Sequence, residues 1–187
     1  MPSKLQLAKL HHFFNILDYN RNGILQEGDF TEVGINMCEV LGIEKDSEKY
    51  ADIIDRSKRL FKQMLHDMGL SNQSEIPLDK WIEFFTTYVY NTKDTSHLKN
   101  YILLITLYVF DVFDQNNDGT LSVDEYIDMF TIYHIDVKYS AKSFVNLDVD
   151  KNSYISKREL LNAVTEYFIS NDPKSEGNWL FGNWEEN

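Results

Sequence analysis

A twelve-residue segment with oxygen-bearing side chains at alternate positions constrains this chain more than any other feature. In the copy from Asp114 to Glu125, DQNNDGTLSVDE, acidic or amide side chains occupy the first, third and fifth positions, glycine the sixth and glutamate the twelfth. A chain that curls at this point directs alternate oxygens to a common centre, and glycine admits the positive φ that the turn requires. The complete pattern is that of a calcium-binding loop between two helices.

Each of these positions has a role in holding Ca²⁺, which takes about six to eight oxygen ligands without strict angles. Short side chains and one backbone carbonyl supply most of the oxygens. The closing glutamate binds with both of its oxygens from the first turn of the exit helix. The predicted ligands are Asp114, Asn116, Asp118, the Thr120 carbonyl, Ser122 through a water, and Glu125.

The segment DVDKNSYISKRE, from Asp148 to Glu159, repeats the pattern with one departure. Ser153 replaces the turn glycine, which we expect to cost about 1 kcal/mol of backbone strain. Three carboxylates remain among the ligand positions, so we expect this loop to bind calcium. The predicted ligands are Asp148, Asp150, Asn152, the Tyr154 carbonyl, Ser156 and Glu159.

Another copy, DYNRNGILQEGD from Asp18 to Asp29, is the first loop in chain order and ends in aspartate where glutamate is expected. The shorter side chain reaches less far, and only two carboxylates face the ion. Coordination should therefore fall towards six, which suits Mg²⁺ better than Ca²⁺. We expect the weakest calcium site of the three and the one most open to magnesium. Its predicted ligands are Asp18, Asn20, Asn22, the Ile24 carbonyl, Gln26 and Asp29.

Apolar residues flank each loop at constant spacing, four and one residues before it and one after, and they fix the register independently of the ligands. The same spacing locates one more segment, Gly69 to Lys80, which is the second loop in chain order. Here Lys80 stands where the closing carboxylate belongs. A lysine there repels a cation, so we expect this loop to be metal-free and structural. One apolar residue in each loop should pair loops through a short ladder: Leu25, Ile76, Leu121 and Ile155.

The sequence thus predicts an all-α fold of four helix–loop–helix units in two tightly packed lobes, with short two-stranded ladders between paired loops. Residues 1–91 form the first lobe and residues 97–170 the second, and the polar run from Asn91 to Ser96 connects them. Residues 171–187 are predicted to pack on the core as a hydrophobic tail, through Trp179, Leu180, Phe181 and Trp184.

With three active loops, an inactive second one and the closing segment EYFISNDPKSEGNWLFG, Glu166 to Gly182, the chain resembles the sarcoplasmic calcium-binding proteins of the EF-hand family, and among them the calexcitin group. The resemblance implies a compact helical fold in the cytosol of muscle or nerve. It also implies roles that range from calcium and magnesium buffering to calcium-triggered signalling.

Composition limits the partners and the cellular compartment that we expect for this chain. The formal net charge of −12, from 30 acidic and 18 basic residues, argues against nucleic acid and anionic membranes as partners. The single cysteine, Cys38, lies in an apolar-spaced run and is expected to be a buried core thiol in a reducing compartment. There is no secretory leader pattern, and the longest apolar run, Tyr101 to Phe110, is too short to span a bilayer. We expect a cytoplasmic monomer, with any protein target unknown.

Other functions have weaker support. Relatives on this fold bind coelenterazine, as photoproteins or as luciferin carriers, and His97 or His134 with aromatic residues would have to line the cavity. The closing residues of the photoprotein type are absent, and we expect the aromatic residues to form a core.

Adjacent His11 and His12 chelate a metal poorly, and we expect both to be solvent-exposed. No nucleophile–base pair stands out, so we expect no enzyme.

The five methionines are dispersed, whereas sensors that grasp a target expose Met-rich grooves. This favours a buffer or a modest conformational signaller over a groove-opening sensor, and both remain open.

Overall fold

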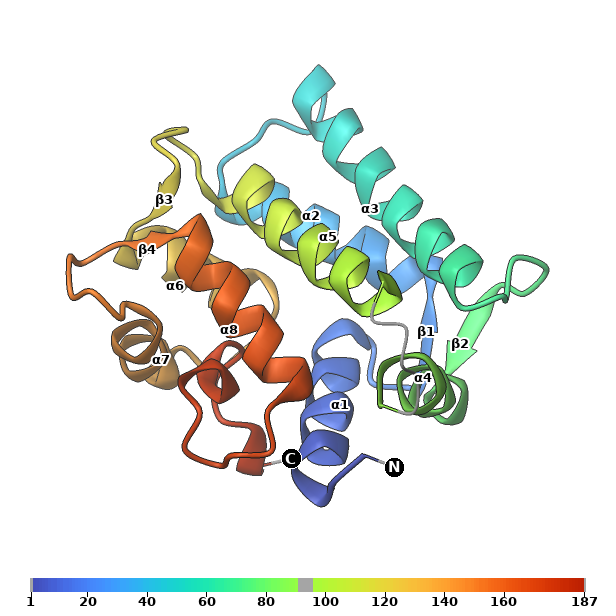
Figure 1. Ribbon diagram of the computed structural model, residues 1–187. Helices are drawn as coiled ribbons and strands as arrows, with labels where there is room; N and C mark the ends of the chain where they lie inside the picture. Colours follow the sequence, from blue (N-terminus) through green and yellow to red (C-terminus); the bar gives the residue numbers. More distant parts are fainter. Residues whose placement is uncertain (1, 91–95, 187) are drawn as a thin grey trace.

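The computed structural model describes residues 2–90 and 96–186 (Figure 1). The predicted connection between the lobes falls almost wholly outside this range. In the first half, two helix–loop–helix units follow one another. Their elements are α1 (Lys4–Leu17), β1 (Ile24–Gln26), α2 (Glu27–Val40), α3 (Glu48–Asp67), β2 (Glu75–Pro77), α4 (Leu78–Phe85) and the π-helical turn η1 (Thr86–Tyr90).

The second half repeats the arrangement and adds a tail of short 3₁₀ turns. Its elements are α5 (Ser96–Phe113), β3 (Thr120–Leu121), α6 (Val123–Ile132), η2 (Val137–Tyr139), α7 (Ser140–Leu147), β4 (Ile155–Ser156), α8 (Lys157–Ile169), η3 (Glu176–Trp179) and η4 (Trp184–Glu186). Among the described residues, no helix is both long and apolar enough to cross a membrane.

Two antiparallel ladders join the loops in pairs, on separate sides of the molecule (Figure 1). In one, Leu25 of β1 faces Ile76 of β2; in the other, Leu121 of β3 faces Ile155 of β4. All four side chains are fully buried. The predicted fold class, with its ladders, is therefore confirmed.

Helix α1 lies between α4 and α8 and brings their aromatic side chains together (Figure 1). The ring centroid of Phe13 lies 5.7 Å from that of Trp81 in α4 and 5.6 Å from that of Phe168 in α8. The indole N–H of Trp81 donates to the Leu10 carbonyl at 3.1 Å. The apolar faces of the two halves thus merge into one core, in which Cys38 is also buried, as expected.

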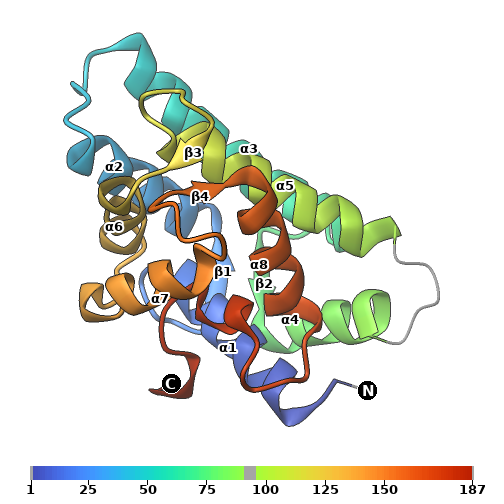
Figure 2. The same ribbon diagram turned by 60° about the vertical axis from the view of Figure 1, so that its left-hand side comes forward.

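The tail folds back against α7 and α8 and reaches α1 (Figure 2). Leu180 and Phe181 are buried, and the Phe181 ring stacks on Phe13 with centroids 4.9 Å apart. On α8, the Glu166 carboxylate accepts a hydrogen bond from the Gly177 amide at 2.9 Å. The ammonium of Lys9 on α1 donates to Asn178 Oδ1 at 2.8 Å. The tail therefore links the first helix of the chain to the last.

Candidate metal sites

Three of the four loops have the same backbone turn. At the fourth loop position, Arg21, Asn117 and Lys151 have φ of 58°, 57° and 58°. At the sixth, Gly23, Gly119 and Ser153 have φ of 81°, 83° and 69°. This shared pair of left-handed residues turns the chain back on itself, so the alternate side chains face inward.

The first acidic residue of each of these loops is fixed by backbone amides. Asp114 accepts hydrogen bonds from the amides of Asp118 at 3.0 Å and Gly119 at 2.9 Å. Asp18 and Asp148 make the equivalent pairs, at 3.1 and 2.7 Å and at 3.0 and 2.9 Å. Each carboxylate is held inside its own loop by that loop's backbone.

The third and fifth positions follow the same rule. Asn116 Oδ1 accepts from the Asp118 amide at 2.9 Å, and Asp118 Oδ1 accepts from the Thr120 hydroxyl at 2.7 Å and amide at 2.8 Å. These bonds lower the pKa of Asp118, chiefly through the Thr120 hydroxyl. The corresponding acceptors in the other two loops are Asn20 and Asn22, and Asp150 and Asn152.

The seventh position supplies the predicted carbonyl ligand at the edge of each ladder. Ile24 begins β1, Thr120 begins β3 and Tyr154 directly precedes β4. The amides of Ile24 and Tyr154 donate to the fifth-position amide oxygens at 2.9 and 2.8 Å, as the Thr120 amide does to Asp118. The ladder therefore sets the position of these residues.

The closing residue of each loop lies in the first turn of its exit helix and joins both ends of the loop. Glu125 accepts from the Gln115 amide at 3.0 Å and from the Ser122 amide at 2.8 Å. Glu159 does the same with Val149 at 2.9 Å and Ser156 at 2.8 Å. The serine hydroxyls cap the helices in return.

Asp29 makes the equivalent bonds in the first loop despite its shorter side chain. Its Oδ2 accepts from the Gln26 amide at 2.8 Å. Its Oδ1 accepts from Asn20, at 3.3 Å from the backbone amide and 2.8 Å from the side-chain amide. The terminal aspartate thus faces the loop, as a ligand there must.

The fourth loop gathers the densest group of acids. Carboxylate oxygens of Asp148, Asp150 and Glu159 lie within 4.8 Å of one another. Burial alone would raise the pKa of Glu159, but hydrogen bonds from Ser156 and from the amides of Asp150 and Val149 outweigh it and lower that pKa. Clustered carboxylates fit a hard divalent cation that prefers oxygen ligands.

The second loop has a different backbone. Its positive φ, of 70°, falls on Gly69 at the first position, and neither the fourth nor the sixth residue is left-handed. Lys80, at the closing position, points to Glu83 of the same helix at 2.8 Å. This loop supports β2 and presents no inward carboxylate at its end.

The expectation that both adjacent histidines are solvent-exposed is wrong for His12. His11 is exposed, but His12 is only 7% exposed, and its Nε2 donates to the Phe181 carbonyl at 2.8 Å. Burial lowers the pKa of His12, and the hydrogen bond to Phe181 opposes that shift. His12 is covered by the tail, which comes from a part of the chain far from α1 in sequence.

The fold and the loops are those of EF-hand calcium-binding proteins. The family profile described as EF hand matches residues 107–130, which hold the third loop, the end of α5 and most of α6. Mitrocomin, a Ca²⁺-regulated photoprotein of the jellyfish Mitrocoma cellularia, is 25% identical over 182 residues, covering 94% of this chain and 87% of mitrocomin.

Two solved structures extend the comparison. The coelenterazine-binding protein of Renilla muelleri, in its calcium-loaded apo form, superposes with a TM-score of 0.76 at 18% identity, covering 97% of this chain and 99% of that one. The sarcoplasmic calcium-binding protein of amphioxus gives 0.75 at 14% identity, covering 98% and 99%. At these identities the likeness shows the fold, and the fold alone does not choose between the two functions.

Proposed function

We propose that this chain is a cytoplasmic, monomeric calcium-binding protein with three metal sites, acting as a calcium and magnesium buffer or as a calexcitin-like signalling protein. The observation that carries the proposal is the contrast among the four loops. Three have matching left-handed turns and carboxylates anchored inward, and the second loop, Gly69–Lys80, has neither. We propose binding as its activity and assign no catalysis.

A luciferin-binding role is the second candidate, because the relatives include mitrocomin and a coelenterazine-binding protein. The comparisons support it about as well as the first. The interior of the molecule favours the first candidate. The apolar cavity between the lobes, beside Phe13, Phe30 and Tyr133, has a volume of about 50 Å³, whereas small-molecule sites usually enclose about 300–1,000 Å³. This interior cavity is therefore too small for a luciferin.

Calorimetric titration with Ca²⁺ tests the proposed sites. We expect three sites in the natural sequence and two in each of Glu125→Gln and Glu159→Gln, because each change removes one charged bidentate ligand. Glu83→Gln is the matched control, since Glu83 lies beside the inactive loop and pairs with Lys80. Three sites in either ligand variant would contradict the assignment.

Repeating the titration in Mg²⁺ addresses the first loop. We propose that Mg²⁺ competes most strongly there, and that Asp29→Glu shifts this loop towards Ca²⁺ because the longer side chain favours bidentate binding. Equal Mg²⁺ competition at every site would count against the special status of Asp29.

Mixing the protein with coelenterazine decides the second candidate. Light on addition of Ca²⁺, or micromolar binding, would establish it and displace the first candidate as the sole function. Neither light nor binding is expected.

A further inference from the structure

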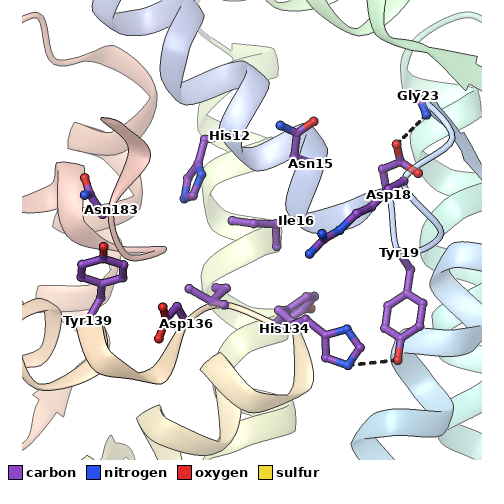
Figure 3. A pocket seen from close by; sticks show the side chains of 13 residues that line it. His12, Asn15, Ile16, Asp18, Tyr19, Gly23, His134, Asp136, Tyr139 and Asn183 are labelled. Carbon is purple, nitrogen blue, oxygen red and sulfur yellow. Dashed lines mark hydrogen bonds between the residues drawn. The ribbon is translucent and has the colours of Figure 1, made fainter. Parts of the chain in front are cut away.

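A cleft of about 530 Å³ opens beside the first metal loop. Both halves of the chain build it. Helix α1 and the loop that follows it form one side, and the α6–η2 connection and the tail form the other (Figure 3). The volume lies within the range of sites that hold small organic molecules. Unlike the interior cavity, this space is large enough for a ligand.

Polar and aromatic side chains face the space from several directions. Figure 3 shows Asn15 and His12 above it, Asn183 and Tyr139 to the left and His134 below. Tyr19 and His134 close one side, with their rings 4.7 Å apart and Tyr19 Oη 3.2 Å from His134 Nε2. Such a lining suits a ligand with an aromatic or apolar body and a polar group.

The two acidic side chains that line the cleft have partners, whereas its arginine has no ion-pair partner among the described residues. Asp136 pairs with Lys138 at 2.8 Å. Asp18 faces inward to its own loop, where it accepts the Asn22 and Gly23 amides. Arg21 also lines the cleft, and among the described residues it makes no ion pair.

An ion in the first loop would change this balance. A divalent cation held by Asp18 and Asp29 offsets both carboxylates, so the Arg21 guanidinium becomes the uncompensated charge at the cleft. Guanidinium groups bind carboxylates, phosphates and similar oxyanions through paired hydrogen bonds.

We propose that this cleft binds a small organic anion, with Arg21 pairing to its negative group and the tyrosine rings contacting its apolar part, and that calcium in the first loop strengthens the binding. The calcium dependence rests on the proposed function of that loop. Of the two carboxylates that the ion offsets, Asp18 lines the cleft, and offsetting its charge should strengthen anion binding about three- to tenfold. By linkage, the anion raises the calcium affinity of the first loop by the same factor.

Three probes with a common ring and different charges test the proposal on the full chain. They are benzenesulfonate, benzyl alcohol and benzyltrimethylammonium, of which the sulfonate neither titrates near neutral pH nor chelates calcium appreciably. NMR shift titrations in excess Ca²⁺ and in excess chelator give the dissociation constants. We expect the sulfonate to bind most tightly, and about three- to tenfold more tightly with calcium. No preference for the sulfonate over the alcohol would overturn the site.

Two variants locate the binding. Arg21→Gln should weaken sulfonate binding about tenfold, a loss of roughly 1.4 kcal/mol. Lys151→Gln is the matched control, since Lys151 holds the same loop position with the same φ of 58° in the fourth loop, away from the cleft. Equal effects of the two changes would overturn the proposal.

The calcium titration keeps the two proposals separable. Three calcium sites together with calcium-independent sulfonate binding would overturn the linkage and leave the proposed function intact. Fewer than three calcium sites would count against the proposed function, whereas the probe preference and the Arg21→Gln effect still judge the cleft.

Discussion

Ser153 is the residue at which the fourth loop departs most from its neighbours. Its φ of 69° is a left-handed conformation, where Gly119 stands in the third loop with φ of 83°. The strain of a side chain here exceeds the extra entropy that glycine gives the unfolded chain. Ser153→Gly should therefore raise the free energy of unfolding of the metal-free protein by about 0.5–1 kcal/mol.

The reverse change supplies the control for this prediction. Gly119→Ser should lower the stability by a similar amount, because it introduces the same strain into the third loop. Urea denaturation in chelator measures both variants. A loss of stability in Ser153→Gly would show that the serine is stabilised by contacts that outweigh its backbone strain.

Lys9 links stability to pH. It is 1% exposed, and burial lowers its pKa to about 8, although the charge of Glu166 opposes the shift. Between pH 8 and the unfolded value of 10.5 the unfolded chain holds a proton that the folded chain has released, so stability from this group rises with pH in that window. From pH 7 to 9.5, the natural protein should gain about 1–2 kcal/mol of unfolding free energy relative to Lys9→Met.

Urea denaturation at several pH values measures that slope. Tyr126, with a pKa raised by burial, contributes the opposite trend near pH 10, so the window stops below it. Lys142→Met is the control, because Lys142 lies on the surface, 3.6 Å above the Trp179 ring centroid. Parallel pH profiles for the natural protein and Lys9→Met would contradict the assignment.

At the scale of elements, Gly34 of helix α2 lies directly against helix α3. A Cβ there would lie 2.6 Å from Ser57 Oγ and 3.3 Å from Ile54 Cδ1. Gly34→Ala should therefore destabilise the protein by about 1–3 kcal/mol through overpacking. Gly28, in the same helix, has no atom within 4 Å of its Cβ position, so Gly28→Ala should add about 0.5–1 kcal/mol from helix propensity. Thermal unfolding compares the two, and equal stabilities would show that α3 simply shifts aside.

The elements also show what the sequence could predict. The partners Leu25 and Ile76, and Leu121 and Ile155, followed from loop spacing alone, because each loop is a local motif with a fixed turn. The inward hydrogen bonds of Asp114 and Glu125 follow from the same fixed turn. Their role as metal ligands stays a prediction.

Contacts between distant segments were beyond that reasoning. The burial of His12 and the cleft at Arg21 depend on the tail and on the α6–η2 connection, which no local pattern places beside α1. The long-range contact of Lys9 could have been recognised in the sequence. Lys9 lies on the same helical face as Leu10 and Phe13. Its ammonium donates to the Ser170 carbonyl, just beyond the end of α8, at 3.1 Å. An apolar face that includes a lysine is a clue to a buried partner.

At the scale of the whole molecule, the two halves are tied at several points besides the shared core. Arg56 of α3 pairs with Asp111 of α5, and Asn36 of α2 donates to the Ile132 carbonyl at the end of α6 at 2.7 Å. Because Asp111 lies three residues before the third loop, the contacts between the halves begin next to a proposed metal site. A sensor that opens a groove would have to break such contacts, together with the aromatic packing around Phe13.

We therefore expect calcium to change the fluorescence of a hydrophobic dye little, since the apolar faces are buried against the other lobe and the tail. The dye is added in chelator and then with excess Ca²⁺, with a groove-opening EF-hand sensor as positive control. Phe181→Ala is the informative variant. It removes the ring that stacks on Phe13 at 4.9 Å and should raise dye binding in both metal states. A large calcium-dependent rise in the natural protein would contradict a closed buffer, because it requires the lobes or the tail to separate when the loops fill.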